Sequence, residues 1–164
     1  MSSAPNYSLV KKTAKGLLHK YEIDNPPIDP IMIAHSEGIG VRFVQFSGEY
    51  SGVSGFYDPE ENAIYVNSEE FPLRQTFTIA HELGHALLHR DWAKSNDYKL
   101  LWRDDSLNDR NDTHEKEANA FAANLLVPRH MLGRYMGDVR PADLSRLFAV
   151  SLPVIKNRMS FEYG

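Results

Sequence analysis

The amino-acid sequence predicts an α+β fold. A small, mainly antiparallel sheet of about three strands is expected to pack on a helix with a His-Glu-x-x-His motif, and further helices follow it. Three observations predict this arrangement. Apolar and polar residues alternate with period two in short segments between residues 41 and 66, as is typical of strands. Residues 72–90 have a helical period instead, and helical patterns return from residue 113 onwards.

The first part of the chain predicts two helices followed by three strands. Proline and glycine mark the ends of both helices, because these residues interrupt helical hydrogen bonding. A turn-forming Asp-Pro-Glu-Glu-Asn sequence separates the last two strands and predicts a hairpin. The helices are expected at 8–22 and 30–38, the strands at 41–46, 51–57 and 63–66, and the turn at 58–62.

The second half of the chain is expected to be helical, apart from one polar connection. Proline is tolerated in a first helical turn, so the histidine-bearing helix is expected to begin near Pro72 and to run to about Arg90. Residues 91–112 are polar with aromatic residues interspersed, and such a connection is either a lid or binding loop, or a surface loop. Further helices are expected at 113–126 and 129–136, with two short ones over 141–161.

Composition limits the class of protein. The 164 residues are 42% hydrophobic and 24% charged, as in a soluble globular domain, so residues 1–164 are expected to form a single domain. The net charge of −4 gives no general reason for nucleic-acid binding, and no run reaches the ~18 apolar residues of a membrane span. Cysteine is absent, which predicts a cytoplasmic protein and leaves nitrogen and oxygen ligands for any metal.

Residues 81–85 read His-Glu-Leu-Gly-His and carry the most specific chemical signal in the chain. Because side chains four residues apart lie on one face of a helix, His81 and His85 can hold one Zn²⁺ together. A metal ion of this kind lowers the pKa of its bound water from ~16 to ~7. Glu82 can then act as general base toward that water. The motif therefore predicts metal-assisted hydrolysis of peptide bonds.

A catalytic zinc ion takes three protein ligands, so a third ligand is expected downstream among His89, His114, Glu115 and Glu117. His89 lies one turn further along the same helix and is expected to line the cleft or to hydrogen-bond a ligand. Glu115 shares the inward face of helix 113–126, whereas Glu117 projects toward solvent. Glu115 is therefore the expected ligand, and Glu117 is the alternative.

Two neighbours of Glu115 bear on its role. Asn119 lies four residues later and is expected to hydrogen-bond a metal-bound histidine. The sequence from Asp112 to Glu115 also fits a capping box, in which the Glu115 side chain would fold back on the first amide of its helix. The sequence leaves this second role open.

Residues 77–89 resemble the core of the ImmA/IrrE-type zinc metallopeptidases, and the resemblance covers about residues 14–160. Two departures are Val127, where methionine is frequent, and the stretch 91–112, which carries no familiar motif. The other matching segments are 26–29, 33–34, 38–41, 54–55, 64–67, 74–75, 115–128 and 147–151.

This resemblance implies a compact zincin-like fold and a zinc metalloendopeptidase. It implies that His81, His85 and Glu115 bind Zn²⁺ and that Glu82 is the catalytic base. It also implies a protein substrate, since such enzymes characteristically cleave helix-turn-helix repressors of mobile elements or stress regulons.

Two details of the predicted mechanism remain open. The donor that stabilises the oxyanion is expected among Tyr98, Tyr135 and His130, and the sequence does not choose between them. The strand at 63–67 is either a sheet edge that aligns an extended peptide or an ordinary sheet strand.

The alternative function is a non-proteolytic regulator that acts on a repressor or DNA and holds zinc structurally. Residues 129–164 carry six Lys or Arg against three Asp or Glu, and the tail 141–164 resembles a small helix-turn-helix unit. Direct nucleic-acid binding is nevertheless not expected, because the tail has no clear recognition helix. No membrane partner is expected.

Overall fold

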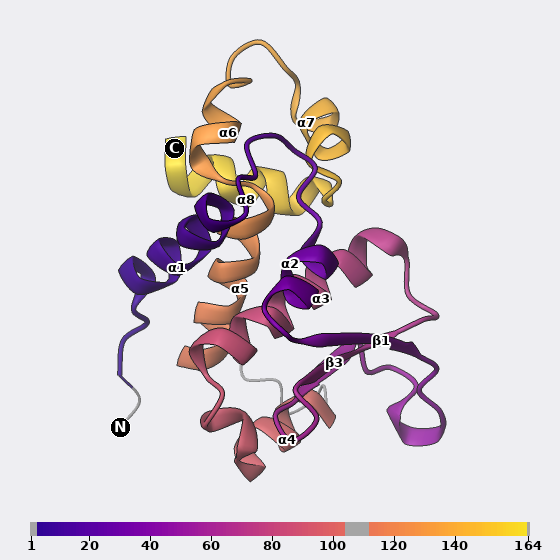
Figure 1. The fold of residues 1–164 in the computed structure, drawn as a ribbon. Helices are drawn as coiled ribbons and strands as arrows, with labels where there is room; N and C mark the ends of the chain where they lie inside the picture. Colours follow the sequence, from indigo (N-terminus) through magenta and orange to yellow (C-terminus); the bar gives the residue numbers. More distant parts are fainter. Residues whose placement is uncertain (1–2, 104–111, 164) are drawn as a thin grey trace.

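A computed structural model describes residues 3–103 and 112–163 of the chain (Figure 1). A small sheet lies to one side of the molecule and the helices make up the rest, which confirms the predicted α+β class. The elements are α1 (Tyr7–Lys20), α2 (Pro30–Ser36), β1 (Gly40–Val44), η1 (Gly48–Tyr50), β2 (Gly55–Asp58), β3 (Ala63–Asn67), α3 (Pro72–Leu88), η2 (Trp92–Lys94), α4 (Asn96–Arg103), α5 (Thr113–Leu126), α6 (Arg129–Gly133), α7 (Pro141–Phe148) and α8 (Leu152–Tyr163).

The sheet is mixed, so the prediction of a mainly antiparallel sheet is wrong for one of its two pairings. The strand order is β1-β3-β2; β2 and β3 form the predicted antiparallel hairpin, but β1 runs parallel to β3. Four of the five residues of β3 are buried, whereas β1 has none that is fully buried. The most buried strand therefore takes the centre, and residues 63–67 are not a sheet edge.

Gly55 brings β2 close to the histidine-bearing helix. A Cβ atom at this position would lie 2.5 Å from the Tyr65 carbonyl oxygen and 2.8 Å from Thr78 Cγ2 of α3. Both distances are shorter than side-chain atoms tolerate, so only glycine lets the sheet lie this near to α3.

Replacing Gly55 with alanine is therefore expected to lower the free energy of unfolding by about 1–3 kcal/mol, the usual cost of overpacking. Urea denaturation measures the effect. The matched control is Gly16→Ala in α1, where nothing lies within 4 Å of the added Cβ; that change is expected to stabilise the protein by roughly 0.5–1 kcal/mol. Equal midpoints for the parent and Gly55→Ala would contradict the close packing.

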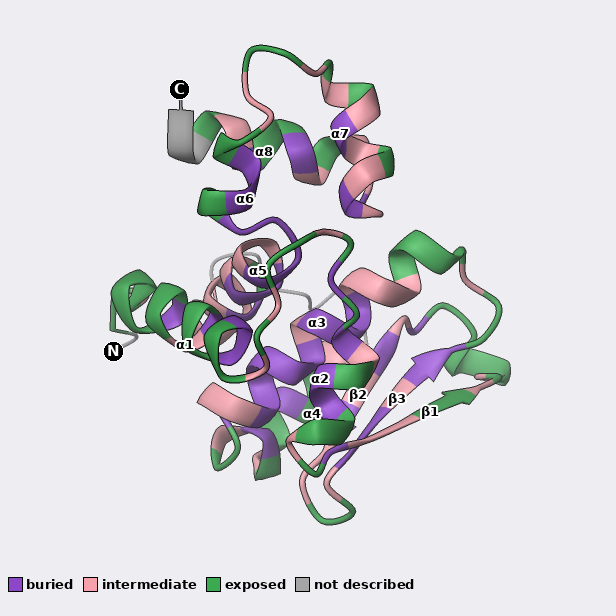
Figure 2. Cartoon of the chain, turned by 45° about the horizontal axis from the view of Figure 1, so that its top comes forward, coloured by how far each residue is buried: buried purple, intermediate pink, exposed green. Residues whose placement is uncertain are grey.

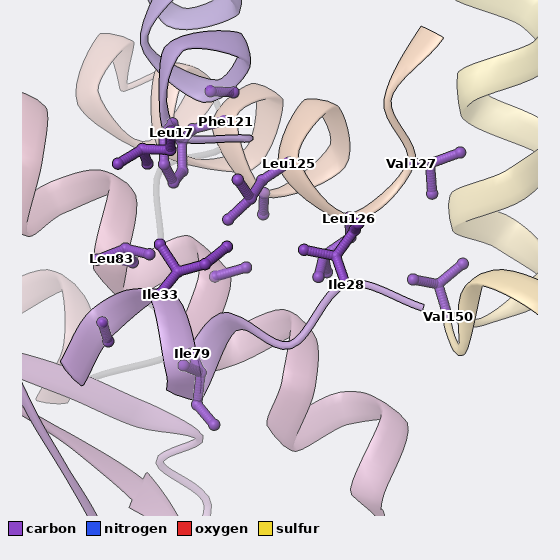
Figure 3. Packing of buried hydrophobic residues seen from close by; sticks show 14 of the residues in the cluster. Leu17, Ile28, Ile33, Ile79, Leu83, Phe121, Leu125, Leu126, Val127 and Val150 are labelled. Atoms are coloured by element: carbon purple, nitrogen blue, oxygen red, sulfur yellow. The ribbon is translucent and has the colours of Figure 1, made fainter. Parts of the chain in front are cut away.

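The main core forms where α3 and α5 cross, with α1 and α2 packed against them. Figure 3 shows Leu17, Ile33, Leu83 and Phe121 pointing into this shared core. In Figure 2 the buried residues follow one face of α1 and much of α3 and β3. The core therefore fixes the relative position of the two helices that carry the candidate site.

Residues 91–112 contain more helix than the sequence predicts. The elements η2 and α4 occupy much of the first half of this stretch, and the part at 104–111 lies outside the described residues. The predicted pair of short helices over 141–161 is confirmed as α7 and α8, while α6 ends three residues before the predicted limit of 136. Among the described helices, none combines the length and apolar character needed to cross a lipid bilayer.

Candidate metal centre

The structure brings His81, His85 and Glu115 together between α3 and α5. Nε2 of His81 lies 3.0 Å from Glu115 Oε2, and Nε2 of His85 lies 2.9 Å from Glu115 Oε1. One ligand atom from each of the three residues falls within 4.8 Å of the other two. Among the described residues, no other group of three metal-binding side chains meets this way.

The crossing of α3 and α5 depends on a small residue within the histidine motif. A Cβ atom on Gly84 would lie 3.0 Å from Cδ1 of Phe121, so the aromatic ring packs directly against the α3 backbone. Phe121 lies six residues after Glu115 in α5. Its packing against Gly84 therefore sets how close the carboxylate comes to the imidazoles.

The first turn of α5 leaves the Glu115 carboxylate available. Asp112 is the cap of this helix, because its Oδ1 accepts a hydrogen bond of 3.0 Å from the Glu115 amide. The Glu115 side chain contacts the two histidines instead of folding back on the helix start. The capping box considered from the sequence is therefore only half formed, by Asp112 alone.

Each histidine is also held through its other ring nitrogen. His81 Nδ1 lies 2.8 Å from Asn119 Oδ1, and His85 Nδ1 lies 2.9 Å from His89 Nδ1. Asn119 and His89 thus occupy the positions expected of residues that hydrogen-bond a metal-bound histidine. These contacts orient both Nε2 atoms toward Glu115.

Glu117 does not point into solvent, so this part of the sequence interpretation is wrong. Its Oε1 lies 2.8 Å from His89 Nε2, and its Oε2 accepts a hydrogen bond of 2.7 Å from the Asn6 amide. The helical phase of α5 missed this contact because both partners come from other elements. No signal in the sequence of α5 indicates it.

Glu82, which is also on α3, is held by a hydrogen bond to Tyr98 of α4. The Tyr98 hydroxyl donates a hydrogen bond of 2.7 Å to Glu82 Oε2 and accepts one of 2.5 Å from the Tyr57 amide. Tyr98 therefore lies in the candidate site. Of the other residues considered as oxyanion donors, Tyr135 packs near Phe148 and His130 lines a different cavity.

Burial and the Glu115 carboxylate dominate the electrostatics of the candidate site. Burial lowers the pKa of His81, but the adjacent Glu115 carboxylate outweighs burial and raises this pKa to about 9. Burial lowers the pKa of His85 to about 4. Burial raises the pKa of Glu115, yet its contacts with the two imidazoles outweigh this and lower the pKa. At neutral pH His81 therefore carries a positive charge beside the Glu115 carboxylate. A bound cation can take the place of this charge.

Burial also raises the pKa of the Glu82 carboxyl to about 7. Only 5% of this residue is exposed, and the neighbouring Glu115 carboxylate adds to the increase. A carboxyl group with a pKa near neutral can both accept and return a proton.

A cleft of about 380 Å³ opens onto these residues. Its walls include Phe77 of α3, Trp102 of α4, and Gly55 at the start of β2. Since β3 is the central strand, β2 is the sheet edge that borders the cleft. The cleft therefore offers both an edge strand and a cluster of titratable groups.

Residues 34–160 match the family described as IrrE N-terminal-like domain. The radiation response metalloproteases IrrE of Deinococcus radiodurans and Deinococcus deserti are each 32% identical to the chain, over 134 and 156 residues. The alignments cover 73% and 86% of this chain but 36% and 50% of those proteins, so the chain spans half or less of their length.

Two further proteins are similar over most of this chain. The immunity region protein 2 of Bacillus phage phi105 is 30% identical over 131 residues, with 79% of this chain and 75% of that protein covered. A solved structure of a Mycobacterium tuberculosis transcriptional regulator has a TM-score of 0.67 and 19% identity, and the match covers 92% of this chain and 46% of that chain. At this identity the structure indicates a shared fold alone. The match over residues 34–160 and these relatives show that the chain belongs to the ImmA/IrrE family of metallopeptidases.

Proposed function

We propose that this chain is a zinc-dependent metalloendopeptidase. The observation that carries the proposal is the convergence of His81, His85 and Glu115 beside the buried carboxyl group of Glu82. Two imidazole nitrogens and one carboxylate oxygen are the donor set of many zinc peptidases, and they leave a coordination position open. When bound, Zn²⁺ supplies Lewis acidity that polarises a carbonyl group and makes water more acidic.

Glu82 is proposed as the general base. Tyr98 holds its Oε2, which leaves the other carboxylate oxygen to take a proton from the attacking water. The same oxygen can then return the proton to the leaving amine. Glu82 does not take part in holding the metal in this proposal, which makes its role separable from metal binding.

The proposed substrate is a helix-turn-helix repressor. Support comes from the similarity to a phage immunity region protein and from membership of a peptidase family. The cleft beside β2 suits an extended segment of such a protein, because an edge strand can align a peptide by backbone hydrogen bonds. Incubation of the zinc-loaded chain with repressors encoded beside its gene, followed by mass spectrometry of the fragments, tests this proposal.

Removal of zinc with 1,10-phenanthroline is expected to stop cleavage and to lower the melting temperature, and added Zn²⁺ is expected to reverse both effects. The stability difference follows from binding to the folded state and is about 2.7 kcal/mol when free zinc is 100 times its dissociation constant. Calorimetry with and without chelator measures it. A melting shift without cleavage of any tested repressor would favour the alternative of a purely structural zinc ion.

A further inference from the structure

A chain of hydrogen bonds leads from the candidate metal centre to the first helix of the protein. His85 Nδ1 contacts His89 Nδ1 at 2.9 Å, and His89 Nε2 contacts Glu117 Oε1 at 2.8 Å. The Asn6 amide donates to the other carboxylate oxygen, Glu117 Oε2, at 2.7 Å. Both histidines are buried, with 0% and 7% of the residue exposed. The histidine part of this chain therefore lies in the protein interior, and the chain reaches the surface at Asn6.

The chemistry of these groups fixes where the protons lie. An ionised carboxylate only accepts hydrogen bonds, so Glu117 requires the proton of His89 to sit on Nε2. The Nδ1 of a neutral His89 is then an acceptor, and the facing Nδ1 of His85 must be the donor. The Glu115 carboxylate makes the same demand on Nε2 of His85. A cation held by these two groups would replace that proton, so that a neutral His85 keeps its proton on Nδ1 and has its lone pair on Nε2.

We propose that Glu117 is a positioning residue of the metal centre: through His89 it fixes the proton of His85 on Nδ1, so that Nε2 of His85 is left free to bind the metal. This inference rests on the proposed function only in assuming that His81, His85 and Glu115 hold zinc. The opposite proton arrangement would place a hydrogen on Nε2 of His85, where it would compete with the metal.

The segment before α1 completes this arrangement. Besides the Asn6 amide on Glu117, the Thr113 hydroxyl donates a hydrogen bond of 2.6 Å to the carbonyl oxygen of Ser3. Both contacts join residues 3–6 to the first turns of α5. The N-terminal segment thereby holds the Glu117 carboxylate in the position that receives the His89 proton.

The first test replaces the carboxylate by an amide. In Glu117→Gln one acceptor oxygen becomes an NH₂ group, so only one of the two N–H donors can be satisfied. Zinc affinity, measured by competition with a chromophoric chelator, is expected to fall about 10-fold. This is the lower end of the range for losing a partner of a metal-bound histidine, because His89 itself remains in place. The neighbouring Lys116→Gln is the control and is expected to keep the parent affinity.

The second measurement identifies the ring protons directly. In the zinc-loaded parent with ¹⁵N-labelled histidine, NMR is expected to place the proton of His89 on Nε2 and that of His85 on Nδ1. In Glu117→Gln the His89 proton is expected to redistribute toward Nδ1. A His89 proton on Nδ1 in the parent would overturn the inference, and so would equal zinc affinities of the parent and Glu117→Gln.

The N-terminal contact has its own matched pair of variants. Asn6→Pro removes the amide hydrogen that reaches Glu117, whereas Asn6→Ala keeps it and removes only the side-chain cap on the Leu9 amide. Zinc affinity is expected to fall in Asn6→Pro and to stay at the parent value in Asn6→Ala. Equal affinities of these two variants would contradict the role of the N-terminal segment.

None of these readouts uses peptide cleavage. A parent protein that binds zinc with the expected ring protons but cleaves no repressor contradicts the proposed function and supports the inference. A parent protein that binds no zinc contradicts both. A Glu117→Gln variant with a lower melting temperature but unchanged zinc affinity and ring protons shows a merely structural role and overturns the inference.

Discussion

Replacing Glu82 with glutamine is expected to reduce the rate of peptide cleavage by about 10²–10⁴-fold, the range for removal of a general base. Glutamine has nearly the same shape and can still accept the Tyr98 hydrogen bond, but its amide oxygen is a very weak base. Zinc binding is expected to be unchanged, because the metal is assigned to His81, His85 and Glu115. Cleavage of a repressor under saturating zinc, together with the zinc content of the purified variant, measures both effects.

The matched control is Glu60→Gln, which makes the same chemical change at an exposed position in the β2–β3 turn. It is expected to cleave at the parent rate. A Glu82→Gln variant that cuts its substrate as fast as the parent would show that another group serves as the base. A variant that loses zinc would show instead that Glu82 takes part in metal binding.

Replacing Phe121 with alanine is expected to lower the free energy of unfolding by about 3–5 kcal/mol, the usual range for a buried phenylalanine. The side chain is fully buried and its ring lies against the α3 backbone at Gly84. The resulting cavity would lie between the helix that carries the histidines and the helix that carries Glu115. We therefore also expect weaker zinc binding in the fraction that remains folded.

Chemical denaturation of the metal-free protein measures the stability change. Phe71→Ala is the control, since this phenylalanine is 83% exposed and its removal is expected to change stability by less than about 0.5 kcal/mol. If Phe121→Ala unfolds at the parent midpoint, the contact between α3 and α5 does not contribute as described.

The helices could be predicted from the sequence because their apolar residues recur at helical spacing and their ends carry recognisable stop signals. Pro72 begins α3 as expected, and the helix predicted over 113–126 has the bounds of α5. The hairpin could also be predicted, since a turn-forming sequence separates β2 from β3. These features depend on residues close together in the chain.

The order of the strands could not be predicted in the same way. Alternation of apolar and polar residues identifies a strand but not its neighbour. The segment between β1 and β2 includes η1 and is long enough to let β3 enter between them. The buried character of Ile64 and Val66 is a hint that β3 is central, but it becomes decisive only when both pairings are seen.

In the candidate site, too, the sequence predicts what depends on one helix and misses what depends on contacts between distant elements. Helical phase placed Glu115 on the inward face of α5, and its carboxylate lies against both imidazoles; its role as a ligand stays a prediction. The same phase placed Glu117 in solvent, because a helical projection contains no information about Asn6 or His89. The contact of Tyr98 with Glu82 could not be predicted either, since it depends on how α4 packs beside the cleft.

The contact between Asn6 and Glu117 joins residues that are 111 positions apart. During synthesis α1 leaves the ribosome long before α5, so the growing chain lacks the carboxylates of α5 until this helix has been made. A nascent polypeptide that stops before α5 therefore has no assembled centre, and any hydrolytic activity can begin only after α5 has been synthesised and has packed against α3.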